Sequence, residues 1–371
     1  MQSIKQYPFY VKSTIIIFGL VLICHALFNL RDILAPIAFS LIIAILLNPL
    51  VNKLQQRGVK KFLAIFIALA LALICVSAVI YFISAQLANF ADSLPQLKLK
   101  VNEYFKELQQ WVAIHLKLPV ANQQKMLHEA SAGSRSLLGQ TLGGVLGMLS
   151  FFILVPIYVF LLLFYKTLMI NFLHEAFTEE NTTRVSAVLT ETKTAIQSYM
   201  VGLLLEALVV ATLNSVALLL CGVKYAILLG VIGALLNVLP YIGGIIAIAL
   251  PVLMALVTKN GITTPAAIVI SYTIIQFIDN HFLIPFLVSS KVKINAFISI
   301  VVVLLGGTLW GISGMFLSIP FMAILKIIFD RLPEMKPWGK LLGDHIPTRH
   351  KGDIWKRKRA VSEKIVGKTK T

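Results

Sequence analysis

Acidic side chains are scarce in this sequence. Only 16 of the 371 residues are Asp or Glu, and only Glu206 and Asp279 lie well inside apolar stretches. Charged residues of both signs make up 13% of the chain and hydrophobic residues 58%, far from the roughly quarter-charged usage of soluble domains. The composition excludes an ordinary soluble domain and predicts an all-α polytopic membrane protein.

Motifs of the common enzyme classes are missing as well. The sequence has no G-x-x-x-x-G-K-[ST] loop for ATP and no G-x-S-x-G nucleophile, and His174-Glu175 lacks the second histidine of a zinc helix. The three cysteines, Cys24, Cys75 and Cys221, fall in apolar runs without metal-ligand spacing. We therefore predict no enzyme, no cofactor and no metal, so that any transport is passive or driven by a gradient.

Basic residues are in excess, with a net charge of +17, and they sit in loops and in the tail. The segment 51–61 carries four bases and no acid, and the tail 331–371 carries twelve bases against four acids. By the positive-inside rule both segments are cytoplasmic, which also places the N-terminus inside. We expect these bases to set orientation and to contact anionic lipid at the cytoplasmic face, rather than nucleic acid.

Apolar runs predict about eight membrane elements and five regions. The predicted spans are Ser13–Leu30, Ile33–Leu50, Phe62–Ser84, 142–165, Ala195–Cys221, Tyr225–Val257, Pro265–Ser289 and Asn295–Phe329. The predicted regions are the first three spans (1–84), an external amphipathic helical region (85–140), the fourth span with a cytoplasmic connector (141–194), a repeat-containing transport region (195–330) and a basic cytoplasmic tail (331–371).

Two of these runs, 225–257 and 295–329, are too long for one span. The first has 33 residues, so as one helix it would be about 50 Å long, against a hydrocarbon core of about 30 Å. Each is interrupted near its centre, and at an offset of 69 residues the two units align. We predict two re-entrant helical hairpins in an inverted repeat, with plain long spans as the alternative. The predicted hairpin tips are Pro240, Tyr241, Gly243 and Gly244, and Trp310, Gly311 and Gly314.

Charge supports the hairpins, because two plain spans would place Lys291 and Lys293 outside, against the positive-inside rule.

Polar side chains inside these elements are the candidate site. A carboxylate in a span costs about 3 kcal/mol on insertion scales, so an acid kept inside a span indicates a functional site. Glu206 and Asp279 fall on equivalent faces of the two repeat units, and Gln276, Asp279 and Asn280 share one helix face. Together with Asn237 they predict a polar pathway for a substrate and a coupling ion, H⁺ or Na⁺. The alternative is interhelical hydrogen bonding alone.

Several stretches of the second half resemble the signature of the autoinducer-2 exporter family of bacterial inner-membrane transporters. They are Cys221–Tyr225, Pro240–Gly244, Asp279-Asn280 through Pro285, Ser290-Lys291, Gly306–Gly314, Pro320, Phe329–Arg331 and Lys336–Gly339. Many members have proline at the position of Gly244 and a basic residue at that of Phe286. The resemblance implies export of a small polar molecule such as a quorum signal, sodium/proton antiport in some members, and homo-oligomers.

Three functions therefore follow as hypotheses. The first is a secondary transporter, an exporter of a small polar substrate that meets its ions at broken hairpins near the middle of the membrane. The second is a sodium/proton antiporter of the same family. The third is a membrane scaffold that transports nothing and uses the external region and the basic tail.

Overall fold

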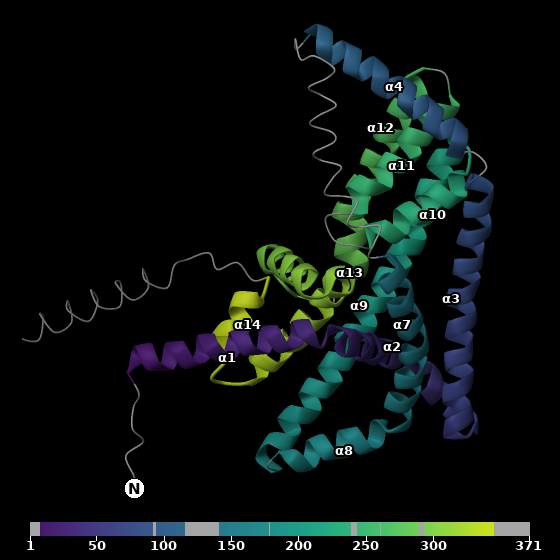
Figure 1. Cartoon of the computed structure of the whole chain (residues 1–371). Coiled ribbons are helices and arrows are strands. Elements are labelled where there is room, and N and C mark those ends of the chain that lie inside the picture. The colour runs from purple at the N-terminus through teal and green to yellow at the C-terminus, as the bar shows by residue number, and fades with distance from the viewer. Residues whose placement is uncertain are drawn as a thin grey trace, which may run out of the picture.

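The computed structural model of this chain describes residues 8–91, 94–115, 141–177, 179–238, 243–259, 261–288 and 293–344. Within these ranges the regular elements are all helices and no β-strand forms, which confirms the predicted all-α fold class (Figure 1). Six of the helices are long and apolar enough to cross a membrane, or seven if a bent pair forms one span. The chain is thus a multi-pass membrane protein, and the count of eight elements stays a prediction.

The N-terminal half supplies the longest uninterrupted apolar helices. Its elements are α1 (Phe9–Asn29), α2 (Arg31–Gln56), α3 (Lys61–Ala91), α4 (Leu94–His115), α7 (Thr141–Phe164), α8 (Lys166–Ala176) and α9 (Glu179–Leu220). Helix α9 runs without a break through position 194, where the predicted connector ends. Of the predicted external region, 92–93 and 116–140 lie outside the described residues.

The C-terminal half consists of shorter and more irregular elements. They are α10 (Ala226–Asn237), α11 (Gly243–Thr258), α12 (Thr263–Ile278), a π-helical continuation η1 (Asp279–Val288), α13 (Ala296–Arg331) and α14 (Lys336–Leu342). The π-helix continues α12 directly, so the two together form one apolar rod of 26 residues. The five regions predicted from the sequence stay a prediction.

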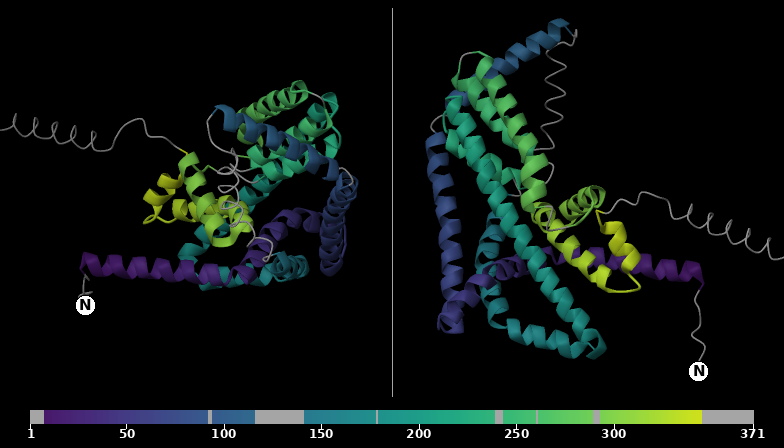
Figure 2. Two further views of the ribbon diagram at one scale, coloured as in Figure 1. Left: turned by 45° about the horizontal axis from the view of Figure 1, so that its top comes forward. Right: turned by 180° about the vertical axis from the view of Figure 1, so that it is seen from behind.

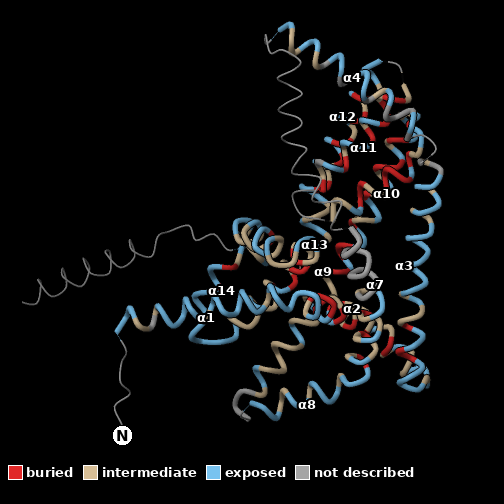
Figure 3. The backbone as a smooth tube through the Cα atoms, in the orientation of Figure 1, coloured by how far each residue is buried: buried red, intermediate tan, exposed pale blue. Residues whose placement is uncertain are grey.

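Helix α9 runs through the fold, and several other elements pack along it (Figures 1 and 2). Helices α10 and α12 pack against it near one end, while α2, η1 and α13 pack on it closer to the middle. Buried residues concentrate where α9 meets its neighbours and where α2, α3 and α7 meet, whereas most of α1 and α3 is exposed (Figure 3). The exposed helices carry large apolar side chains, as expected where lipid or another membrane helix covers a surface.

The first over-long segment folds back on itself. Helices α10 and α11 pack against each other, and a Cβ placed on Gly243 would collide with the carbonyl group of Leu236. A glycine is needed here because only a residue without a side chain lets the two backbones approach so closely. The turn itself, 239–242, includes the predicted tip residues Pro240 and Tyr241 and lies outside the described residues.

The second over-long segment also reverses direction, inside α13. Gly311 has φ 61° and ψ −139°, a conformation open essentially to glycine alone. Beyond it, Ser318 Oγ donates to the Val302 carbonyl at 2.9 Å, although a straight helix would separate these residues by about 24 Å. Both segments therefore fold back near their predicted breaks. That each hairpin enters and leaves through one face of the membrane stays a prediction.

Candidate functional site

Four polar side chains from three parts of the chain meet beside the break between α10 and α11. Glu206 lies midway along α9, Asn237 is the last residue of α10, and Gln276 and Asp279 lie where α12 passes into η1. Glu206 is 3% exposed and Asp279 is fully buried, at 0%. Among the five pathway residues predicted from the sequence, these four come together; we call them the carboxyl cluster.

The amide of Asn237 joins the two acids. Its Nδ2 donates to Asp279 Oδ2 at 2.8 Å and to Glu206 Oε1 at 3.2 Å. Gln276 Nε2 lies 3.4 Å from Asp279 Oδ2 and 3.5 Å from Asn237 Oδ1, which makes it the weaker donor of the two amides. The side chain of Asn237, at the end of α10, thus donates hydrogen bonds to both carboxyl groups.

The cluster has donors but no cation. Across the described ranges, neither acid lies within ion-pair distance of a lysine, arginine or histidine. Asp279 Oδ1 is also buried without any hydrogen-bond partner there. Two ionised carboxylates in such a place would repel each other strongly, since interactions between buried charges are weakly screened. The arrangement is therefore suited to taking up a proton or a monovalent cation.

The close packing of the two hairpin helices sets the position of the cluster. A Cβ on Gly244 would lie 3.1 Å from Gln276 Oε1 and 3.7 Å from Asn237 Oδ1, so this glycine leaves room for both amides. Gly243 likewise leaves room for the backbone of Leu236 and Asn237. The two glycines predicted as tips of the first hairpin, Gly243 and Gly244, are thus neighbours of the cluster.

The prediction for Asn280 is wrong in its geometry. Sequence spacing placed it on the same face as Gln276 and Asp279, but it is exposed and makes no described contact with either. Asp279 is the first residue of the π-helix, and Asn280 follows it directly. Consecutive residues of a helix do not face each other, and here Asp279 is buried while Asn280 is exposed.

A second group of buried polar atoms continues away from the cluster and was missed by sequence reasoning. The hydroxyl of Tyr272 and Oδ1 of Asn214 are buried without a partner within the described ranges. A Cβ on Gly233 would lie 3.4 Å from Asn214 Nδ2 and 3.7 Å from Tyr272 Oη, so both side chains meet this glycine. The available signal was spacing: Tyr272 precedes Gln276 by four residues, and Asn214 follows Glu206 by eight.

The second hairpin contacts a different element. Trp310 Nε1 donates to the Leu27 carbonyl of α1 at 2.9 Å. A Cβ on Gly314 would collide with the carbonyl oxygen of Gly306, so the two halves of α13 touch backbone to backbone. Trp310 and Val238, which border the two breaks, also pack against the same buried core of α2, α9, η1 and α13.

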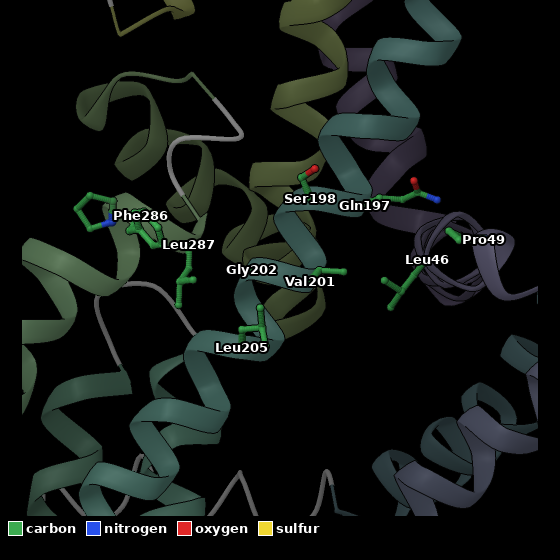
Figure 4. A pocket seen from close by; sticks show the side chains of 10 residues that line it. Leu46, Pro49, Gln197, Ser198, Val201, Gly202, Leu205, Phe286 and Leu287 are labelled. Carbon is green, nitrogen blue, oxygen red and sulfur yellow. The ribbon is translucent and has the colours of Figure 1, made fainter.

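A separate cavity of about 660 Å³ lies between α2, α9 and η1. Figure 4 shows its lining side chains, which are mostly apolar, with Gln197 and Ser198 as polar exceptions. None of the four cluster side chains lines it, although Leu205 on its wall directly precedes Glu206. The cavity is large enough for a small molecule, and it lies beside the cluster rather than containing it.

Comparison with known proteins gives a consistent picture over most of the chain. The sequence model described as "AI-2E family transporter" matches residues 14–334. "Putative transport protein YrrI" of Bacillus subtilis (strain 168) is 24% identical over 319 residues, covering 83% of this chain and 88% of that protein. "AI-2 transport protein TqsA" of Escherichia coli (strain K12) is 24% identical over 340 residues, covering 90% and 96%. "Putative permease PerM" of the same strain is 26% identical over 317 residues, covering 83% and 90%.

Proposed function

The chain belongs to the AI-2E transporter family, and from that premise we propose that it is a secondary transporter which exports a small polar molecule across the bacterial inner membrane. That it is a membrane transporter and not an enzyme follows from the family. The substrate class, the export direction and coupling to an ion are our proposal. Autoinducer-2 is the first candidate substrate, because one relative is named "AI-2 transport protein TqsA".

One observation carries the proposal, the joining of Glu206 and Asp279 by Asn237. Because Asn237 ends α10 at the hairpin break, movement of the hairpin would separate its amide from one or both acids. Loss or gain of a cation between the acids would in turn favour one hairpin position over the other. A ligand that binds two conformations unequally shifts the balance between them, and this is what coupling requires.

Flux across a membrane tests this proposal. The full-length protein in proteoliposomes should move labelled autoinducer-2 faster under an imposed pH or sodium gradient than without one. Sodium-driven proton movement without any organic substrate would instead support the antiporter. That alternative is also favoured by the two acids, neither of which has an ion-pair partner among the described residues. Absence of every gradient-dependent flux would support the non-transporting scaffold and overturn the proposal.

Labelling of single cysteines tests the re-entrant arrangement. We expect Ile262→Cys, in the exposed corner before α12, to react with a membrane-impermeant thiol reagent from outside in a chain whose own cysteines are replaced. Lys293→Cys should react from the cytoplasmic side only. It stands in for Lys291, which lies outside the described residues. An external position 293 would contradict the inverted hairpins, and Lys53→Cys serves as the cytoplasmic reference.

The localisation and the assembly belong to the same proposal. We expect both termini in the cytoplasm, because the basic segments 51–61 and 331–371 favour that side under the positive-inside rule. A homo-oligomer is proposed because α1 and α3 expose long apolar surfaces in the single chain, including Ile17 at 61% and Ile74 at 65%. Crosslinking in native membranes would distinguish subunit contacts from lipid contacts on these helices.

A further inference from the structure

A second cavity, of about 370 Å³, lies between α2, α7, α8 and α9, apart from the carboxyl cluster. It is found where the chain turns by 61° between α7 and α8. Its walls are apolar, formed among others by Leu41, Ala44, Leu162, Leu163, Ile170 and Leu189. An apolar cavity at the end of a membrane helix is suited to hydrocarbon.

Two lysines without carboxylate partners lie at this cavity. Lys166 and Lys193 both line it, and across the described ranges neither forms an ion pair. Lys166 Nζ donates instead to the neutral Asn48 Oδ1 at 2.9 Å. Burial lowers the pKa of Lys166, and the positive charges of Lys193 and then Lys61 lower it further. An anion here would relieve this repulsion.

A hydroxyl is available beside the two lysines. Thr192 Oγ1 is buried and has no hydrogen-bond partner within the described part of the chain. Thr192 lines the same cavity as its neighbour Lys193. Buried hydroxyl groups without a partner are uncommon in folded proteins. Two ammonium groups, one amide and one free hydroxyl form a donor set that fits a phosphate.

The position of α8 places this cavity at the membrane surface. Helix α8 exposes Leu168, Met169 and Phe172 beyond the end of the apolar helix α7, as a helix lying on a bilayer does. Lys61 lies over the ring of Phe164, 5.4 Å from its centre, at the same end of α7. Basic pockets between membrane helices at this level are where anionic headgroups bind.

We propose that this cavity is a binding site for one anionic phospholipid. The phosphate lies between Lys166 and Lys193 and accepts a hydrogen bond from Thr192, while an acyl chain occupies the apolar cavity. A lipid is favoured over free phosphate because most of the lining is apolar. The site holds α8 against α2 and α9 and is independent of the proposed transport function.

Native mass spectrometry of the full-length protein in detergent tests the proposal. Phosphatidylglycerol should bind in preference to phosphatidylcholine with the same chains. The double variant Lys166→Gln/Lys193→Gln should weaken phosphatidylglycerol binding by about tenfold or more, since each basic residue near an anionic surface contributes about a fivefold effect. Lys53→Gln/Lys60→Gln removes two exposed charges from the same face and should leave this binding unchanged.

Two further arms separate a lipid from a free anion. Ile170→Trp fills the apolar part of the cavity and should weaken phosphatidylglycerol binding while the lysines stay in place. Inorganic phosphate, added in excess, should fail to displace the lipid. Displacement by phosphate together with no effect of Ile170→Trp would identify an anion site without an acyl chain. If both lysine double variants lose phosphatidylglycerol binding equally, the lipid is held by general surface charge and not by this cavity. Either result overturns the proposal.

Discussion

Asp279→Asn is expected to abolish ion-coupled flux while leaving the protein folded. The change keeps the shape of the side chain and an oxygen that can accept from Asn237, but it removes one of the two negative charges of the cluster. At about 4 Å and an effective dielectric constant of about 20, one charge pair is worth roughly 4 kcal/mol. A loss of at least a hundredfold in ion affinity is therefore expected. Gradient-driven flux in proteoliposomes measures it.

Two variants serve as comparisons for Asp279→Asn. Glu206→Gln removes the charge of the other acid. Asn237 Nδ2 lies 3.2 Å from Glu206 Oε1 and 2.8 Å from Asp279 Oδ2, so we expect a loss of the same kind but smaller. Asn280→Ala changes the neighbouring residue, which is exposed, and should retain wild-type flux. If Asp279→Asn and Asn280→Ala behave alike, the cluster only holds helices together and has no part in coupling.

The sequence predicted the members of the cluster better than its geometry. Glu206 and Asp279 were recognisable because an acid in an apolar stretch is costly and therefore informative. The offset of 69 residues placed them on equivalent faces of the two repeat units, and in the structure both accept a hydrogen bond from the same amide. The bridging role of Asn237 could not be predicted, since it depends on where α10 ends relative to α9 and α12, which are contacts between distant parts of the chain.

Local rules failed where the backbone is irregular. Asn280 was placed on the face of Gln276 and Asp279 by helical spacing but is exposed, and no residue type predicts a π-helix at Asp279. The fold-back at Gly311, in contrast, was predictable, because the segment was too long and held glycines at its centre. The bond from Trp310 to the Leu27 carbonyl joins residues 283 positions apart and had no sequence signal.

The two hairpins differ in what they contact, although the sequence predicted them as equivalent halves. The end of α10 contacts the two acids through Asn237, whereas the bend in α13 contacts α1 through Trp310. Val238 and Trp310 nevertheless pack on one shared core.

Gly243→Ala is expected to disrupt both the first hairpin and the cluster. The added Cβ would collide with the Leu236 carbonyl group and lie 2.7 Å from Asn237 Cα. These are backbone atoms, so the collision is relieved only by moving the end of α10, and overpacking of this kind costs about 1–3 kcal/mol. That movement displaces the Asn237 amide from Asp279 and Glu206. We expect a lower melting temperature and loss of gradient-driven flux.

Two other glycines provide a graded control for Gly243→Ala. At Gly244 the nearest atom to an added Cβ is a side-chain oxygen, Gln276 Oε1 at 3.1 Å, which can rotate away, so Gly244→Ala should only reduce flux. At Gly19, in α1, nothing lies within 4 Å, and alanine is the better helix former, so Gly19→Ala should keep flux and stability. Wild-type flux in Gly243→Ala would mean that the position of Asn237 is irrelevant to coupling. We therefore expect the loss of flux to be largest for Gly243→Ala, smaller for Gly244→Ala and absent for Gly19→Ala. This order follows from how close each added Cβ comes to the backbone beside the cluster.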